Sequence, residues 1–203
     1  MNLGTFGENT MPYAPSHKPK TRKRIVDAAK RMFKLHGYDG VGVNRIMGEA
    51  GLTHGGFYAH FSGKEELFAE VVRWFGPSDK IRKGSISEKC MPEDNLKAFV
   101  RSYLSKIHMN DVIEGCPLAS LTMEVSRAGP VVRQSYTQAL RDAVTRFRRQ
   151  MTQRETNTEA AAYSTLAICI GGMALARAVD SNEMAEVILK ACKEAAVEQI
   201  EGA

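Results

Sequence analysis

Apolar residues recur at helical spacing along most of this chain, and no segment shows the sustained alternation of a half-buried strand. The first such helix face consists of Ile25, Ala28, Ala29, Met32 and Phe33. With 203 residues, of which 43% are hydrophobic, the chain is long enough to bury a core. The sequence therefore predicts an all-α protein.

Four short amphipathic helices are predicted in the N-terminal part. The first starts at Thr21, its expected N-cap, and stops before Gly37, while the second covers residues 43–50 and ends at Gly51. Glycine at these two positions suits the left-handed conformation that follows many helices.

The third and fourth predicted helices follow closely. Thr53 is the expected N-cap of the third helix. Ser62 and Glu65 match the S-x-x-E capping box of the fourth, which runs to Phe75. Two short helices joined by a tight glycine-containing turn form a helix-turn-helix, so we predict this motif from the second and third helices.

The rest of the chain is also predicted to be helical, after a turn-rich segment at residues 76–92. A helix is expected at residues 93–112, breaks at residues 115–117 and 128–130, and further helices at residues 131–153, 157–179 and 183–200. We therefore expect a disordered arm at residues 1–17, one helical domain at residues 18–75 and a second at residues 76–203.

Positive charge is concentrated in the N-terminal domain. Residues 17–75 contain eleven lysines and arginines against six aspartates and glutamates, and this excess of five equals the net charge of +5 of the whole chain. A positive field confined to one segment predicts contact with a polyanion. A basic face that is merely solvated is the alternative.

Several classes of protein are not favoured by the sequence. There is no run of about 18 apolar residues and no signal-peptide core, so we expect a soluble, cytoplasmic protein. The cysteines lie far apart and form no C-x-x-C pair; they are Cys90, Cys116, Cys169 and Cys192. We therefore expect no metal site, no disulfide framework, no cofactor and no catalytic residues.

The N-terminal domain contains several short motifs at consistent spacing. "TRKRIVDAAKRMFKLHGYDGVGVNRIMGEAGLTHGGFYAHFSGKEELF", residues 21–68, includes a GY pair after the first helix, an A-G-L turn, a G-x-[FL]-Y-x-H-F core and an S-x-K-E-x-L cap. In this combination the segment resembles the DNA-binding domain of TetR-family transcriptional regulators. The resemblance implies a C-terminal effector-binding and dimerisation domain, and a dimeric repressor that a small-molecule inducer releases from a palindromic operator.

The recognition helix of such a motif presents its N-terminal residues to base edges. In this sequence those residues are Thr53, His54, Gly55 and Gly56. The resemblance implies phosphate contacts from Tyr58, His60 and Lys64. Further candidates are Asn44 and Arg45 in the second helix and the basic arm of Lys18, Lys20, Arg22 and Lys23. The alternatives are a packing ring for Tyr58, a surface or capping histidine for His60, and a solubilising tail for the arm.

The adjacent glycines Gly55 and Gly56 are unusual at the start of a helix, where each costs about 1 kcal/mol relative to alanine. In a recognition helix, the missing side chains would let the backbone come close to DNA. Direct base contacts would then fall to Thr53 and His54, which predicts a weak base code.

By the same resemblance, the middle helices hold an effector and the last two helices form the dimer. The candidate effector residues are Phe99, Tyr103, Ile107, His108, Cys116, Leu121, Glu124, Arg127 and Tyr136. The candidate dimer residues are Tyr163, Leu166, Ile170, Gly171, Ala174, Leu189 and Cys192.

Two alternatives remain open from the sequence. Cys116 would lie at a helix N-terminus, where the dipole favours a reactive thiolate, so the protein would be a redox or electrophile sensor; a buried, inert thiol is the other interpretation. An enzyme using His108, Cys116 and Glu124 is a further alternative.

Overall fold

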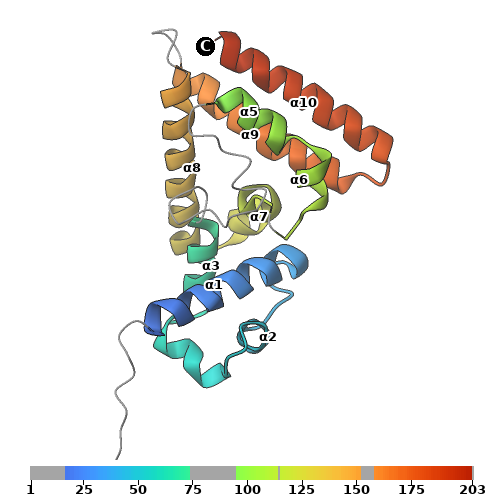
Figure 1. Cartoon of the computed structure of the whole chain (residues 1–203). Coiled ribbons are helices and arrows are strands. Elements are labelled where there is room, and N and C mark those ends of the chain that lie inside the picture. The colour runs from blue at the N-terminus through green and yellow to red at the C-terminus, as the bar shows by residue number, and fades with distance from the viewer. Residues whose placement is uncertain (1–16, 74–94, 114, 152–157, 203) are drawn as a thin grey trace, which may run out of the picture.

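The protein is helical throughout the part of the chain that its computed structural model describes, which is residues 17–73, 95–113, 115–151 and 158–202. The all-α prediction is therefore confirmed. The N-terminal helices form one end of the molecule and the last two long helices the other, and α8 runs from α9 to α3 (Figure 1). The predicted arm, apart from its last residue, and the turn-rich segment at residues 76–92 lie outside the described ranges.

The N-terminal elements are α1 (His17–His36), α2 (Val43–Glu49), the 3-10 helix η1 (His54–Ala59) and α3 (Lys64–Arg73). The predicted N-cap at Thr21 is wrong, because α1 begins four residues earlier and Thr21 lies inside it. The basic arm is accordingly not an arm, since its lysines and arginines lie on the first turns of α1. The predicted helix stops are confirmed, because Gly37 and Gly51 have φ angles of +72° and +64°.

The start of α3 differs in detail from the predicted capping box. The backbone amide and the hydroxyl of Ser62 both donate to Oε2 of Glu66, at 2.7 and 2.8 Å, so Glu66 and not Glu65 closes the cap. These two bonds are the main reason why the pKa of Glu66 is lowered.

The C-terminal elements are α5 (Leu96–Tyr103), α6 (Lys106–Asn110), α7 (Pro117–Arg127), α8 (Pro130–Gln150), α9 (Thr158–Ala178) and α10 (Asn182–Gly202). The single helix predicted at residues 93–112 is wrong, because Ser105 interrupts it. The Ser105 hydroxyl donates to the Ser102 carbonyl at 2.7 Å and accepts from the His108 amide at 3.2 Å, so it ends one helix and caps the next.

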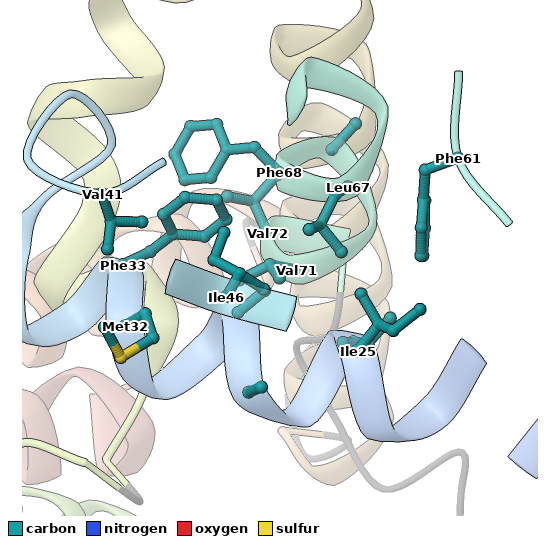
Figure 2. Packing of buried hydrophobic residues seen from close by; sticks show 14 of the residues in the cluster. Ile25, Met32, Phe33, Val41, Ile46, Phe61, Leu67, Phe68, Val71 and Val72 are labelled. Carbon is teal, nitrogen blue, oxygen red and sulfur yellow. The ribbon is translucent and has the colours of Figure 1, made fainter. Parts of the chain in front are cut away.

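The N-terminal core crosses the predicted domain boundary. It contains Phe33 and Ile46 of the helix-turn-helix domain, Phe68 and Val72 of α3, and further residues of α7 and α8, namely Leu121, Val125 and Val132. Figure 2 shows the labelled side chains of α1 and α3 pointing toward one another around Ile46. Because α3 and α1 both pack against α7, the two domains share apolar surface.

The C-terminal core lies between α5, α8, α9 and α10 and includes Phe99, Phe147 and Met173. The approach of α10 to α9 is close, since a Cβ at Gly172 would lie 2.7 Å from Sγ of Cys192. Of the described helices, only α9 has the length and composition of a membrane span, and it packs against α7, α8 and α10.

Candidate DNA-binding surface and effector-domain cluster

The turn between α2 and η1 is held by its own backbone and by one arginine of α1. Gly51 has a φ of +64°, which a side chain would strain, and the Leu52 amide donates to the Met47 carbonyl at 2.9 Å. Nη2 of Arg24 donates to the Ala50 carbonyl at 2.7 Å. These bonds fix the angle between the two helices of the motif.

The 3-10 helix η1 buries one phenyl ring and exposes the groups around it. Phe57 is fully buried, whereas Thr53 and His54 are exposed and Tyr58 is 64% exposed. Thr53 occupies the N-cap position, but its side chain accepts no capping hydrogen bond, in contrast to the prediction. Tyr58 is therefore not the half-buried packing ring that was the alternative from the sequence.

Internal packing does not require glycine at either position of the Gly55–Gly56 pair. Neither residue has a positive φ. Within the described part of the chain, a Cβ added at Gly55 would meet no atom within 4 Å, and at Gly56 the nearest atom is Cε of Met47 at 3.8 Å, an ordinary contact. Packing among the described residues therefore does not explain the glycine pair.

A hollow of about 440 Å³ lies beside the exposed start of η1. Its lining consists of Lys18, Thr21, Met47, Leu52, Thr53, Gly56, Ala59 and His60. Nδ1 of His60, another lining residue, is buried and has no hydrogen-bond partner among the described residues. Burial lowers the pKa of His60, and the positive charges of Lys18 and Arg22 lower it further. Lys18 and His60 both line the hollow, and each is a residue type that binds phosphate oxygens.

Arg22 is bound to α3 rather than turned to solvent. Its guanidinium donates to the carbonyl of His60 and to the carboxylate of Glu70, and it lies 4.0 Å from the centroid of the Phe61 ring. These contacts connect α1 to the segment between η1 and α3. The DNA contact expected from Arg22 stays a prediction.

Two other candidate phosphate ligands also contact groups of the protein. Nζ of Lys64 lies 4.1 Å from the centroid of the Tyr38 ring, and burial lowers the pKa of Lys64. Nη2 of Arg45 lies 3.1 Å from Nε2 of His36. Asn44 is exposed, as are Lys18 and Lys20 on α1.

Three predicted effector residues come together where α5, α6 and α7 meet. His108 is buried; its Nδ1 donates to the Tyr103 carbonyl at 2.7 Å, and its Nε2 accepts from the Cys116 amide at 3.1 Å. Because a carbonyl only accepts, these bonds select the neutral imidazole with its proton on Nδ1. Burial lowers the pKa of His108 to about 4. Burial, and next the nearby Cys116 thiol, raises the pKa of Tyr103.

Arg177 of α9 completes this cluster and was missed by the sequence reasoning. Its guanidinium donates to the carbonyls of His108 at 2.7 Å and Met109 at 3.1 Å, and to the Ser120 hydroxyl at 3.1 Å. One signal in the sequence could have pointed to Arg177. It is a charged residue in an otherwise apolar helix, and Glu159 in the first turn is the only other charged residue of α9.

The other predicted effector residues are scattered. Ile107 is 70% exposed and Arg127 is exposed, so both face solvent. Leu121 and Tyr136 pack in or against the N-terminal core, and Phe99 lies in the C-terminal core.

The three residues of the enzyme alternative, His108, Cys116 and Glu124, do not come together in one site. Glu124 lies eight residues after Cys116, which is about 12 Å along a helix. Its Oε1 lies 2.9 Å from where a Cβ at Gly37 would be, so it faces α1. Nε2 of His108 is already bonded to a backbone amide. Among the described residues, no group of three or more His, Cys, Asp or Glu is placed to hold a metal ion.

The predicted dimer residues divide into buried and accessible ones. Leu166 and Leu189 are only 1% and 3% exposed within the C-terminal core, so they offer no free surface. Ile170, Gly171 and Cys192 are half-buried, while Ala174 is exposed and Tyr163 is 42% exposed.

An exposed helix-turn-helix on the positively charged domain, joined to a separate helical core, defines a DNA-binding regulator. The family profile described as "Bacterial regulatory proteins, tetR family" matches residues 25–71, and "Tetracyclin repressor-like, C-terminal domain" matches residues 92–192. The chain belongs to the TetR family of transcriptional regulators, and it is a ligand-responsive DNA-binding regulator.

Relatives and solved structures agree with this assignment. The chain is 30% identical over 135 residues to the HTH-type transcriptional regulator LmrA of Bacillus subtilis, covering 66% of this chain and 72% of that one. It is 29% identical over 144 residues to the HTH-type transcriptional repressor AcnR of Corynebacterium glutamicum, covering 68% and 69%. A TetR-family regulator from Cytophaga hutchinsonii has the same fold, with a TM-score of 0.68 at 19% identity over 94% of this chain and 98% of that one. These relatives do not favour the thiol-sensing alternative through Cys116.

Proposed function

We propose that this protein is a homodimeric repressor that binds a palindromic operator through η1 and leaves it when a small molecule occupies the C-terminal domain. The observation that carries the proposal is the exposed start of η1. Thr53, His54 and Tyr58 face solvent there, beside two glycines that the subunit's own packing does not need.

The DNA contacts divide into base readout and backbone binding. The glycine pair lets the η1 backbone approach the major groove, and Thr53 and His54 reach base edges. Tyr58, His60 and Lys64 bind phosphates, with further contacts from the exposed Lys18, Lys20 and Asn44 and from Arg45. To bind a phosphate, Lys64 would leave the Tyr38 ring. Its ammonium would then exchange a cation–π contact for a charge-assisted hydrogen bond.

A second copy of the chain is the proposed cover for the exposed face of α9 and α10. On α9, small residues and one ring follow a single stripe: Ala160, Tyr163, Ala167, Gly171, Ala174 and Ala178. Leu175 beside it is 59% exposed, and Met184 and Val187 on α10 are 55% and 67% exposed. Covering this apolar surface in a two-fold dimer would place two recognition elements for two half-sites.

Repression and release are proposed from the relatives and from the shared core. AcnR is named a repressor, and LmrA a transcriptional regulator. An effector that binds better to one arrangement of the C-terminal domain shifts the population toward it. Because α7 and α8 contribute Leu121, Val125 and Val132 to the N-terminal core, a shift of these helices changes the position of the helix-turn-helix.

DNA binding tests the proposal directly. Fluorescence anisotropy at physiological salt would compare a duplex from the promoter region next to the protein's own gene with a random duplex of equal length. We expect binding to the promoter duplex to be about a thousandfold tighter or more. Equal affinity for the two duplexes would refute the specific regulator, whatever the effector is.

A further inference from the structure

The C-terminal end of α1 is bonded to the turn between α6 and α7. Nζ of Lys34 donates to the carbonyl of Ile113 at 2.8 Å and also to the carbonyl of Gly115. The donor belongs to the DNA-binding domain and both acceptors belong to the effector domain, about 80 residues later in the sequence. A hydrogen bond from a charged donor is stronger than one between neutral groups, and this ammonium makes two.

The same turn is held from the other side by α9. Arg177 donates to the carbonyls of His108 and Met109, and it also approaches the Asp111 carbonyl at 3.4 Å. All these acceptors lie in α6 or directly after it. The guanidinium therefore takes the place of the intrahelical partners that the last carbonyls of a short helix lack.

Gly115 is where the two sets of bonds meet. Its carbonyl accepts from Lys34, and a Cβ at this residue would lie 2.6 Å from Nη2 of Arg177 and 2.6 Å from the Asp111 carbonyl oxygen. A side chain does not fit without moving the arginine or the turn. The neighbouring Cys116 amide donates to His108, which fixes the start of α7 to α6.

We propose that Lys34 is the positioning residue that connects the helix-turn-helix to the effector domain, through the α6–α7 turn that Arg177 holds on α9. A change in α6 or α7 is passed to α1 because the turn carries the acceptors of Lys34, and DNA binding at η1 acts on the turn by the same bonds. This inference rests on the proposed function, in which effector and DNA favour different arrangements of one dimer.

The experiment is hydrogen exchange followed by mass spectrometry on the full chain, read in peptides that cover α6 and the start of α7. Each protein is measured free, with the promoter duplex and with the random duplex. The variants are Lys34→Met, Lys34→Arg and Gly115→Ala. Lys106→Met is the matched control, because it also removes one lysine, at the first position of α6, but its ion pair is with Glu186 of α10.

We expect Lys34→Met and Gly115→Ala to exchange about tenfold faster in these peptides than the wild type when free, as loss of a charge-assisted hydrogen bond predicts. Lys34→Arg and Lys106→Met should exchange like the wild type. The promoter duplex should slow exchange of the turn in the wild type and in Lys106→Met, but not in Lys34→Met, even at saturating DNA.

Wild-type exchange in free Lys34→Met would overturn the proposal, and this arm needs no DNA. Equal slowing by the promoter duplex in Lys34→Met and wild type would also overturn it. By contrast, failure of the proposed function appears as equal affinity for the two duplexes, with the exchange difference between the free proteins intact. If Gly115→Ala does not fold, the comparison of Lys34→Met with the wild type and with Lys106→Met still tests the proposal.

Discussion

The N-terminal core and the outer face of α9 and α10 are both apolar, but only the first is complete within one chain. Phe33, Phe68 and Ile46 are fully buried among their neighbours. On α9 and α10, in contrast, Leu175 and Val187 are more than half exposed. The difference teaches that the DNA-binding end is stabilised by packing inside the subunit, whereas the other end exposes apolar surface that the proposed dimer would cover.

The largest expected effect comes from opening the N-terminal core. Phe33→Ala should lower the free energy of unfolding by about 3–5 kcal/mol, because it removes a fully buried ring, whose centroid lies 5.1 Å from that of Phe68, and leaves a cavity in the core. Met123→Ala, at a residue that is 65% exposed on α7, is the control and should change it by less than about 0.5 kcal/mol. Urea denaturation measures the free energy of unfolding of both variants. Similar losses in Phe33→Ala and Met123→Ala would contradict the view that the N-terminal core stabilises this end of the molecule.

The next effect is on assembly rather than on folding. Leu175→Glu places a charge on the face proposed to be covered, so the dissociation constant of the dimer should rise by about a hundredfold or more. Thr145→Glu on the exposed side of α8 is the control and should leave it unchanged. Sedimentation measures the constant. A wild type that is monomeric at micromolar concentration would contradict the dimer.

Acid should weaken the C-terminal core more than the N-terminal one. The folded-state pKa of His108 is about 4 against an ordinary value of 6.5, so between these values the unfolded chain takes up a proton that the folded chain does not. Stability should therefore be complete above about pH 6.5 and fall by up to roughly 3 kcal/mol on acidification toward pH 4.

The variant His108→Gln isolates this contribution. It should remove that part of the pH dependence of unfolding, whatever its effect on stability at pH 7. An unchanged slope in His108→Gln would show that the buried imidazole is not the titrating group.

Much of the N-terminal half was predictable because its signals are local. The positive φ angles of Gly37 and Gly51 confirm two helix ends that glycine alone indicated. Choices among neighbouring partners were harder, as when Glu66 took the capping role predicted for Glu65. The break between α5 and α6 was missed because it depends on two side-chain bonds of Ser105, which hydrophobic spacing does not report.

The effector domain was predictable only in part. The sequence named Tyr103, His108 and Cys116 as candidates, and the fold brings them together. It gave no reason to join Lys34 to Gly115 or Arg177 to His108, since each pair is far apart in the chain and is set by helix packing. Which members of the apolar periodicity face outward on α9 was equally a matter of tertiary contacts.

The most direct test of the DNA-binding account uses two glycines that are both free of internal constraint. Among the described residues, a Cβ at Gly55 or at Gly48 would meet no atom within 4 Å, but Gly55 is the second residue of η1 whereas Gly48 lies in α2. Gly55→Ala and Gly48→Ala should each leave the free energy of unfolding unchanged or raise it by up to about 1 kcal/mol. The measurement is the affinity for the promoter duplex. We predict about a tenfold loss for Gly55→Ala, or roughly 1.4 kcal/mol, with Gly48→Ala binding like the wild type; wild-type affinity in Gly55→Ala would contradict close approach of the η1 backbone to DNA.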